Sequence, residues 1–394
     1  MSACEPSAEI HCANLIRTAT NQGLDGQIEW VGVGGTQMEK AGCTILENTV
    51  RRAAMLHNAF GQIGFFYRVL KQIREFFETH AIDLVIVCDS PAFNFHVAKA
   101  ARKAGIPVLF YVAPQLWAWA PWRIAKLRKC CTKLACILPF EEDWFCGRNI
   151  DAKFVGNPLF DEITIDFTEG YKDYTGYDPR KVRVALFPGS RNAEIKTLWP
   201  AMQRIAIQIK QKWPEATFTA CAAGEEKLEQ LRKRKITGLK CDFTVGNVYE
   251  TADQADFALV ASGSATLQVA AAGCPMVILY QSSRILWHLL GRWLIRTRFL
   301  SLVNILAGRE VVTEFMPYFS SIRPVADRCS QIIGNRTLLM KTSMELENLV
   351  APLSRGSASQ EVLQMALSLI PDPGRQDRDQ ALESHLRPPV KTPR

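Results

Sequence analysis

A short apolar run that ends in a glycine turn and opens a helix constrains this chain more than any other feature. Residues Val182–Phe187 predict a buried strand, and the turn Pro188–Arg191 follows it directly before a helical pattern. Gly189 lets the backbone approach a ligand closely, while Ser190, the free N–H groups of the helix start and the guanidinium of Arg191 can bind anionic oxygens. The turn therefore indicates a diphosphate-bearing substrate in an α/β protein. The alternative interpretation is an ordinary strand-to-helix connection with a solvated arginine.

Size and composition narrow the kinds of protein that fit. At 394 residues with 48% hydrophobic content, the chain exceeds the size at which single cores usually divide, so two domains are expected. The net charge of +8 suits anionic partners such as nucleic acid, phosphorylated metabolites or an anionic membrane face. The 12 cysteines are scattered without a C-x-x-C pair, which predicts neither a disulfide framework nor a zinc site. A reducing cytosol is the simplest compartment.

No secretory signal or membrane span is predicted. Polar residues follow Met1 almost at once. The longest apolar stretch, roughly 258–280, is interrupted by hydroxyl residues, Gln268 and Pro275. It is typical of a strand, turn, helix and strand rather than of a transmembrane helix.

Short β-branched runs alternate with helical patterns, which is typical of parallel sheets built from β-α-β units. The segment 166–183, rich in Asp, Gly, Lys and Tyr without apolar periodicity, is the expected interdomain linker. The expected organisation is an N-terminal Rossmann-like domain at 1–165, a C-terminal one at 184–345, C-terminal helices at 346–370 and a disordered tail at 371–394. The expected strands are 31–34, 83–88, 108–112, 136–138 and 153–155 in the first domain, and 182–187, 216–222, 257–261 and 276–280 in the second.

A second strand-to-helix turn follows the apolar run Phe257–Ala261. Small and hydroxyl-bearing residues at Ser262–Ser264 open a helix with free N–H groups, and Gly273 ends it. Two such turns in one half of the chain favour a ligand at the carboxyl ends of a parallel sheet. The alternative is a Gly/Ser loop that only packs against the sheet.

A carboxylate ends a strand in the first half. The run Val85–Cys88 leads into Asp89, Pro91 turns the chain, and a helix is expected near Asn94. Such an Asp can act as a general base, but it is also a common helix cap. Glu5 follows the stub of a first strand and is open to the same two interpretations.

These motifs together resemble one family, the bacterial lipid-A-disaccharide synthases, over about residues 1–370. The segments 111–119, rich in tryptophan, and 304–310 are its most specific parts. The matching motifs, in chain order, are Cys4–Ser7 with His11–Ile16, Val33–Gly35 with Ala41–Cys43, Asp89–Asn94, Tyr111–Trp119, Leu138–Glu141, Phe154–Leu159, Leu186–Ile195, Ser262–Gln268 and Ser301–Val312.

The resemblance implies a GT-B glycosyltransferase, with two Rossmann-like domains whose parallel sheets face an interdomain cleft and the nucleotide in the C-terminal domain. It implies transfer of 2,3-diacylglucosamine from UDP-2,3-diacylglucosamine to 2,3-diacylglucosamine 1-phosphate with inversion. The products are a β-1,6 disaccharide and UDP, in lipid A biosynthesis of a Gram-negative bacterium. Neither a cofactor, a metal nor a nucleic-acid partner is implied, and a homodimer is one assembly to expect.

A single displacement needs a base for the acceptor hydroxyl and positive or dipolar groups for the leaving diphosphate. By matching position, the resemblance makes Asp89 the base and Arg191 the diphosphate partner, with Glu5 near the sugars. The substrate-binding residues that it implies are Ser7, Asn94, Gly189, Ser190, Glu194, Ser262, Gly263, Ser264, Thr266, Gln268, Asn304, Arg309 and Glu310.

Several positions depart from the family pattern. Cys4 replaces a Gly, which reduces the expected backbone freedom of the first turn. Gln268 replaces a Glu that typically bonds the ribose, a loss of the order of 1 kcal/mol. The first strand also begins later than in the family. A misassigned start codon and a trimmed chain are the two explanations for this difference. The remaining departures are Ala8-Glu9 for Gly-Asp, Ala92 for a second Asp and Val303 for Pro.

Lipid substrates require membrane access, and two segments are candidates. The segment 60–68 contributes Phe60, Phe65 and Phe66, and the segment 284–296 mixes aromatic and basic residues, so it can lie in an anionic interface. The alternative for the second is a core-facing helix with a solvated basic edge. We expect peripheral attachment to the cytoplasmic face of the inner membrane. The residues of the second segment are Arg284, Trp287, Arg292, Trp293 and Arg296.

Two other functions stay open. One is a catalytically weakened or silent membrane-associated homologue, which the departures at Cys4, Ala8, Ala92 and Gln268 favour. The other is a UDP-sugar GT-B transferase with another acceptor, against which the tryptophan segment argues.

Overall fold

A computed structural model describes residues 1–51, 59–161, 163, 172–282, 288, 297–354 and 356–370. The chain divides into two compact units. Unit 1 comprises Met1–Gln115, Trp122–Pro158 and the chain from Gly356 onward, and unit 2 comprises Leu116–Pro121 and Leu159–Arg355. The expected tail at 371–394 lies outside the described residues.

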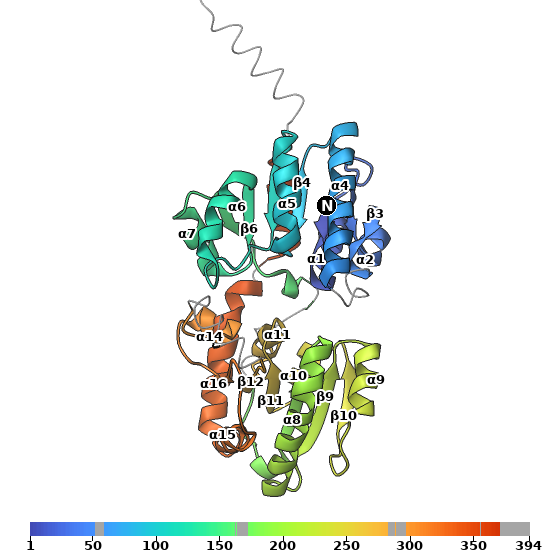
Figure 1. The fold of residues 1–394 in the computed structure, drawn as a ribbon. Helices are drawn as coiled ribbons and strands as arrows, with labels where there is room; N and C mark the ends of the chain where they lie inside the picture. The colour runs from blue at the N-terminus through green and yellow to red at the C-terminus, as the bar shows by residue number, and fades with distance from the viewer. Residues whose placement is uncertain are drawn as a thin grey trace, which may run out of the picture. The chain divides into compact units, whose positions relative to one another are not determined.

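Unit 1 is built on a seven-stranded parallel sheet with the strand order β3-β2-β1-β4-β5-β6-β7 (Figure 1). The central strands β4 and β5 are buried along their whole length, because both faces of the sheet are covered by helices. The strands are β1 Ser2–Ala3, β2 Val31–Gly34, β3 Thr44–Asn48, β4 Val85–Cys88, β5 Val108–Tyr111, β6 Lys133–Cys136 and β7 Ala152–Phe154.

The helices of unit 1 form two groups. Helices α4, α5 and α6 pack side by side in one group, and α1 packs against α2 and α17 in the other. Helix α17 returns from the C-terminal end of the chain, and buries Val362 and Leu363 in the same core as Leu15 and Ile16 of α1. The helices are α1 Pro6–Asn21, α2 Thr36–Lys40, α4 Ala59–Thr79, α5 Pro91–Lys103, α6 Ile124–Cys130, α7 Pro139–Cys146 and α17 Ala358–Leu367.

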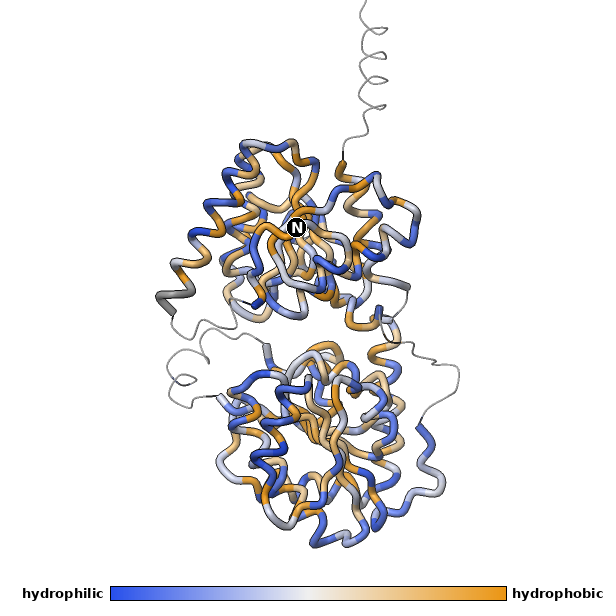
Figure 2. Tube along the Cα trace, turned by 90° about the vertical axis from the view of Figure 1, so that its right-hand side faces the viewer, coloured by the Kyte–Doolittle hydropathy of each residue, from blue (hydrophilic) through white to orange (hydrophobic). Residues whose placement is uncertain are grey.

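Unit 2 contains a six-stranded parallel sheet with the order β10-β9-β8-β11-β12-β13. In both units apolar chain segments run through the interior and hydrophilic ones lie outside (Figure 2). The strands are β8 Arg183–Phe187, β9 Thr217–Ala222, β10 Asp242–Val245, β11 Phe257–Ala261, β12 Met276–Leu279 and β13 Thr313–Phe315. The helices are α8 Asn192–Lys212, α9 Glu225–Lys233, α10 Val248–Asp253, α11 Ala265–Ala271, α14 Leu302–Ala307, α15 Arg323–Ile333 and α16 Arg336–Val350.

The two sheets share one order over six strands, and the sheet of unit 1 has β7 in addition. In each, the first strand lies beside the fourth, so the order reverses between β1 and β4 in unit 1 and between β8 and β11 in unit 2. Parallel sheets bind ligands at the carboxyl ends of the strands on either side of such a reversal. The expected α/β class with two parallel Rossmann-like sheets is confirmed.

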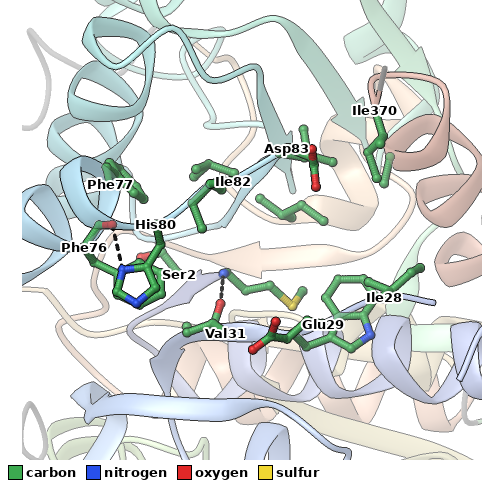
Figure 3. A pocket seen from close by; sticks show the side chains of 18 of the residues that line it. Ser2, Ile28, Glu29, Val31, Phe76, Phe77, His80, Ile82, Asp83 and Ile370 are labelled. Carbon is green, nitrogen blue, oxygen red and sulfur yellow. Dashed lines mark hydrogen bonds between the residues drawn. The ribbon is translucent and has the colours of Figure 1, made fainter. Parts of the chain in front are cut away.

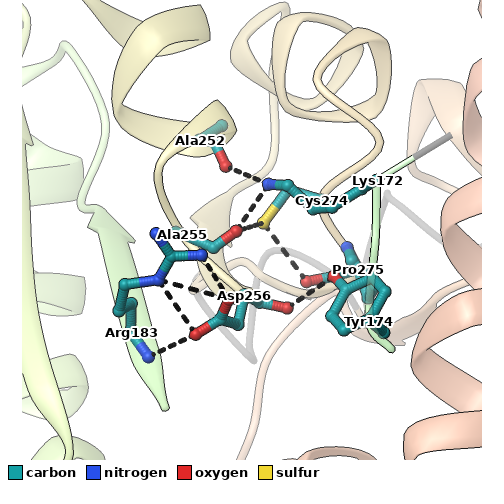
Figure 4. A network of polar contacts seen from close by, with 8 residues as sticks. All are labelled: Lys172, Tyr174, Arg183, Ala252, Ala255, Asp256, Cys274 and Pro275. Atoms are coloured by element: carbon teal, nitrogen blue, oxygen red, sulfur yellow. Dashed lines mark hydrogen bonds and ion pairs between the residues drawn. The ribbon is translucent and has the colours of Figure 1, made fainter. Parts of the chain in front are cut away.

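The segment expected to be a linker, 166–183, packs within unit 2 where it is described. Tyr174 and Val182 are buried in the core of unit 2, and the Tyr174 hydroxyl donates to the carbonyl of Asp256 at 2.9 Å. Lys172 reaches the carbonyls of Ala252 and Ala255 (Figure 4). Aromatic side chains at irregular spacing therefore join this segment to the sheet without forming the periodic pattern of a helix or strand.

An ion pair closes the amino end of strand β8. The Arg183 guanidinium lies 2.6 Å from the Asp256 carboxylate, which also accepts the main-chain N–H of Arg183 at 2.8 Å (Figure 4). Asp256 precedes strand β11, so this pair joins the amino ends of β8 and β11. The carboxyl ends of the same two strands lie at the strand reversal of unit 2.

Candidate active site

Two acidic residues of unit 1 lie at the reversal between β1 and β4. Glu5 is the N-cap of α1 and is exposed, and Asp89 follows β4 and is half-buried. The Ser90 hydroxyl donates to the Glu5 carboxylate at 3.3 Å, which links the two turns. Ser7 is exposed in the first turn of α1. The structure thus brings Glu5, Asp89 and Ser7 together at the carboxyl ends of strands β1 and β4.

The turn after β4 has an unusual backbone. Asp89 and Ser90 both adopt left-handed conformations, with φ of 49° and 42°. Non-glycine residues rarely take this conformation, and consecutive ones persist only where the surrounding structure holds them. Such turns concentrate at functional sites.

Asn94 supplies that restraint. Its amide nitrogen donates to the carbonyls of Cys88 at 2.9 Å and Asp89 at 2.8 Å, and its amide oxygen accepts the Ser2 hydroxyl at 2.7 Å. Because Asn94 is fully buried, it cannot touch a substrate as the structure stands. In this structure Asn94 holds the main chain of the Asp89 turn, and its predicted role in substrate binding stays a prediction.

The substituted residues of the first turn are part of the packing. Cys4 and Ala8 are buried, and neither has a positive φ, so their β-carbons fit without backbone strain. Glu9 is also buried, and its carboxylate accepts the N–H of Gln37 at the start of α2. A longer acid at position 9 therefore caps a neighbouring helix.

His11 lies on α1 under this edge of the sheet. Its ring centroid is 6.1 Å from that of Tyr111 at the end of β5. Burial lowers the pKa of His11 to about 4, so the imidazole is neutral near pH 7. Its Nδ1 atom has no hydrogen-bond partner among the described residues.

In unit 2 the turn after β8 forms as the sequence predicts, but a carboxylate already occupies it. Gly189 takes a φ of 98°, and the main-chain N–H groups of Ser190 and Arg191 donate to Glu194 at 3.0 and 3.1 Å. Arg191 also pairs with Glu194 through its guanidinium at 3.1 Å. A β-carbon at Gly189 would collide with that carboxylate. Glu194 therefore shapes the turn, and the Arg191 side chain remains 74% exposed to solvent.

The second turn of unit 2 lies directly beside the first, because β8 and β11 are neighbouring strands. Ser262 and Gln268 are half-buried, and Gly263 and Ser264 are exposed. Thr266 is fully buried, and its hydroxyl donates to the Gly263 carbonyl at 2.7 Å. Thr266 thus fixes the loop through a buried hydrogen bond. The other four predicted residues of this turn are exposed or partly exposed to solvent.

Asn304 is a second buried amide with a positioning role. Its oxygen accepts the N–H groups of Val311 and Val312 at 2.8 and 3.1 Å. Its nitrogen donates to the Val312 carbonyl at 2.8 Å and to the Glu314 carboxylate at 3.0 Å. Asn304 is fully buried and so holds the loop after α14 without facing solvent itself.

That loop presents Arg309 and Glu310 at the surface. Arg309 pairs with Glu345 at 3.1 Å, and Glu310 is exposed. Glu314 accepts the N–H groups of Leu300 and Ser301 at 2.9 and 3.1 Å in addition to its bond with Asn304. The sequence pattern did not single out Glu314, although an acid ten residues after a conspicuous Asn is compatible with such a network.

Two of the three membrane candidates in the segment 60–68, Phe65 and Phe66, pack inside unit 1. Phe65 is 3% exposed and belongs to the core, and Phe66 packs against Phe93 with ring centroids 4.9 Å apart. The exposed apolar side chains of α4 are Ile63 and Tyr67. The side chain of Phe60 and the residues Arg284, Trp287, Arg292, Trp293 and Arg296 lie outside the described residues.

A cavity of about 310 Å³ lies at the amino ends of the strands of the unit 1 sheet (Figure 3). Its lining includes Val31, Ile82 and Asp83 at the amino ends of strands, Phe76 on α4 and Ile370. Substrate sites of parallel sheets lie at the carboxyl ends, so this cavity is separate from the candidate active site.

All twelve cysteines are free. Among the described residues no group of three His, Cys, Asp or Glu side chains has the arrangement of a metal site. Of the helices in the described ranges, none has the length and apolar character needed to cross a bilayer.

Solved structures with two such sheets share this fold. The S. aureus MnaA–UDP structure matches with a TM-score of 0.60 at 13% identity, covering 94% of this chain and 97% of that chain. The calicheamicin glycosyltransferase CalG4 matches with a TM-score of 0.57 at 11% identity, covering 93% and 97%. At such identities the likeness concerns the fold alone, and it supports the GT-B class.

Sequence comparison is more specific. The lipid-A-disaccharide synthase of Geobacter sulfurreducens is 30% identical over 374 residues, which cover 93% of this chain and 96% of that protein. The lipid-A-disaccharide synthase of Coxiella burnetii (strain Dugway 5J108-111) is 32% identical over 371 residues, with 93% and 97% covered. The family model described as lipid-A-disaccharide synthetase matches residues 1–368. The chain therefore belongs to the lipid-A-disaccharide synthetase family.

Proposed function

We propose that this glycosyltransferase moves 2,3-diacylglucosamine from UDP-2,3-diacylglucosamine to 2,3-diacylglucosamine 1-phosphate. The anomeric centre inverts, and the products are a β-1,6-linked disaccharide and UDP. No metal or cofactor takes part in the proposed step. The supporting observation is the chemistry at the two strand reversals, where unit 1 carries carboxylates and unit 2 carries the exposed guanidinium of Arg191 and the hydroxyl groups of Ser262 and Ser264.

Asp89 is the proposed base. In a single displacement its carboxylate takes the proton of the acceptor 6-hydroxyl while that oxygen bonds to the anomeric carbon of the donor. The bond from this carbon to the diphosphate oxygen breaks, and UDP leaves with the electron pair. The fixed turn that Asn94 holds supports this role, because a base must be held within reach of the proton that it removes. Glu5 is proposed to bind a sugar hydroxyl beside Asp89.

Arg191 is the proposed partner of the leaving diphosphate. Its side chain is largely exposed and uses one Nη atom for Glu194, so other N–H groups remain for the ligand. A guanidinium that binds the diphosphate in two places stabilises the charge that develops as the bond breaks. Glu194 accepts the N–H groups of Ser190 and Arg191, so the proposed diphosphate contact uses the guanidinium, and Glu194 is proposed as a positioning residue.

The nucleotide is proposed to bind over the second turn of unit 2. Ser262, Gly263 and Ser264 offer hydroxyl and N–H donors there, and Gln268 is proposed to bond the ribose. Gln268 donates or accepts as a neutral amide, which is weaker than the bond to a carboxylate. Arg309 and Glu310 are proposed to contact the substrates from the loop that Asn304 holds.

Peripheral attachment to the cytoplasmic face of the inner membrane is proposed, because both substrates carry acyl chains. A homodimer is the assembly that we propose to test by light scattering. A single mass of one chain under assay conditions would reject it.

A catalytically silent homologue is the second candidate. The departures at Ala92 and Gln268 favour it, since they remove a carboxylate from each proposed half-site. Those at Cys4, Ala8 and Glu9 do not, because these residues are accommodated in the core. A transferase with another acceptor is the third candidate.

One assay separates the three. Purified protein is incubated with the UDP donor and the 1-phosphate acceptor, and the products are identified by mass spectrometry and by the anomeric coupling constant in NMR spectra. A β-linked disaccharide with UDP supports the proposal. UDP release only with a different acceptor supports the third candidate, and UDP binding without any product supports the silent homologue.

A further inference from the structure

A groove between α5 and α6 of unit 1 collects positive charge. Its volume is about 720 Å³, and its lining also includes Trp122, Ala125 and Cys130. The cations that line it are Lys99, Arg102, Lys103, Arg123, Lys126 and Lys129.

Helical spacing puts these cations on two facing stripes. Lys99, Arg102 and Lys103 stand at i, i+3 and i+4 on α5, which places them on one face of that helix. Arg123 and Lys126 begin an i, i+3 series that continues along α6, and the two helices pack against each other. Neighbouring faces of one helix pair thus carry like charge.

The four lysines of the groove are not paired with acidic side chains in the described part of the chain. Within the described ranges, no carboxylate lies within ion-pair distance of Lys99, Lys103, Lys126 or Lys129. The ammonium of Lys126 instead lies 4.8 Å from the ring centroid of Phe95.

The like charges act on one another. Burial and then the neighbouring Arg123 and Lys99 lower the pKa of Lys126. Burial, followed by Lys126, Arg74 and Lys99, lowers the pKa of His96 on the same face. Positive side chains of α4, α5 and α6 therefore repel one another at this face, and an anion placed in the groove would reduce that repulsion.

An exposed aromatic residue lies at the same groove. Trp122 is 62% exposed although it is among the largest apolar side chains. On α4, which packs against α5, Ile63 and Tyr67 are 67% and 70% exposed. Tryptophan and tyrosine combine an apolar ring with a polar N–H or O–H group, which suits the headgroup region of a bilayer.

We propose that the α5–α6 groove binds the surface of an anionic phospholipid bilayer, with its lysines and arginines on lipid phosphates and Trp122 among the headgroups. The groove is a different surface from the two segments that the sequence suggested; of the first segment Phe65 lies in the core, and the aromatic and basic candidates of the second lie outside the described residues. The inference deepens the proposed peripheral attachment, and it is independent of the transfer chemistry.

The alternative role of these cations is to stabilise the ends of their own helices. Arg102 and Lys103 lie in the last turn of α5, and Lys129 in the last turn of α6, where positive charge stabilises the helix end. Lys99 and Lys126 lie outside the last turns of α5 and α6, so they are the better test positions.

The test uses the full-length chain and two kinds of vesicle. Co-sedimentation is measured with phosphatidylglycerol-containing vesicles and with phosphatidylcholine vesicles at low salt. The variant Lys99→Glu/Lys126→Glu is compared with Lys181→Glu/Lys240→Glu, which changes the net charge equally at exposed positions of unit 2. Inorganic pyrophosphate binding is measured in parallel by calorimetry.

The wild type is expected to bind the anionic vesicles and not the neutral ones. The groove variant should bind about thirtyfold more weakly or worse, since each basic residue near an anionic surface contributes roughly a fivefold factor. The control variant should stay within about threefold of the wild type, and Trp122→Ala should weaken binding without changing its dependence on salt.

Two results would overturn the proposal. Equal vesicle binding by the groove and control variants would place the membrane surface elsewhere. In the second result the wild type binds pyrophosphate but not vesicles, and the groove variant loses the pyrophosphate binding. The groove would then be a site for a soluble anion. If the charge reversal prevents folding, Lys99→Gln/Lys126→Gln is used with the same criteria.

The transfer assay distinguishes this inference from the proposed function. With substrates dispersed in detergent, the groove variant should retain the wild-type rate. Vesicle binding without any transfer by the wild type would reject the proposed reaction and leave the groove assignment standing.

Discussion

The amide nitrogen of Asn94 donates to the carbonyl of Asp89 at 2.8 Å and holds the proposed base in a left-handed backbone conformation. The same nitrogen reaches the Cys88 carbonyl, and Ser2 on the neighbouring strand binds the amide oxygen. The geometry of this turn is thus set by the first turn of α5 and by strand β1. We propose that Asn94 acts on the reaction through Asp89.

Asn94→Ala should lower both stability and activity. Removing the buried amide leaves main-chain carbonyls without a donor, which costs about 1–3 kcal/mol of unfolding free energy, measured by urea titration. Because the turn then relaxes, kcat should fall by at least about tenfold in the fraction that remains folded, with KM for the donor little changed.

Gln203→Ala is the matched control for Asn94→Ala. Gln203 is also fully buried and bonds the Arg234 carbonyl and the Ile236 N–H, but it lies on α8 away from the strand reversal. It should lose similar stability and keep kcat. Equal loss of kcat in both variants would mean that general destabilisation, rather than the Asp89 turn, controls the rate.

Arg191→Lys should impair donor use without affecting folding. The side chain is 74% exposed, so the unfolding free energy should change by less than about 0.5 kcal/mol. Lysine cannot bind a diphosphate through two parallel N–H bonds, and kcat/KM for the UDP donor should fall roughly ten- to a hundredfold. Arg204→Lys, an exposed change on the same helix, is the control. Steady-state kinetics in which both variants match the wild type would remove Arg191 from the diphosphate site.

Asp256→Ala should destabilise the protein without a direct effect on chemistry. The substitution leaves the Arg183 main-chain N–H without its acceptor and breaks the 2.6 Å ion pair. We expect a loss of about 1–3 kcal/mol in the urea-derived unfolding free energy. Asp178→Ala, which breaks a more exposed pair with Arg180, should lower the unfolding free energy less than Asp256→Ala does. Similar losses in the two variants would contradict the importance of the β8–β11 pair.

His11 should make the protein less stable in mild acid. Its pKa is lowered to about 4 in the folded state from 6.5, so the unfolded chain binds the proton more readily between these values. Stability is therefore complete above about pH 6.5 and falls as the pH drops towards about 4, by roughly 3 kcal/mol for this group.

The measurement is the unfolding free energy as a function of pH for the wild type and His11→Leu. The variant should show a shallower fall across that window, whereas His80→Leu, at an exposed position, should follow the wild type. Parallel curves for all three proteins would show that His11 does not supply the acid sensitivity.

The continuous apolar runs made the central strands predictable. Strands β4, β5, β8 and β11 are covered on both faces, so their sequences are uninterrupted stretches of apolar residues. The strands that were not predicted, β3, β10 and β13, lie at sheet edges and are only partly buried. Their mixed composition, as in Thr44–Asn48, carries no such signal.

The sequence predicts where the candidate site residues lie in the fold, and the roles of these residues stay predictions. The turns at Asp89 and Gly189 follow apolar strands, and their place at the sheet edge follows from the parallel topology. Asn94, Thr266 and Asn304 are buried and bond main-chain groups, which depends on contacts between distant segments. No spacing in the sequence distinguishes such an amide from one that meets substrate.

The most direct test compares disaccharide formation by the wild type and Asp89→Asn at saturating UDP donor and 1-phosphate acceptor. We expect that the wild type forms the β-linked disaccharide and that the variant is slower by about 10²–10⁴-fold with an unchanged unfolding free energy. A variant that forms the disaccharide at the wild-type rate would contradict the assignment of Asp89 as the base.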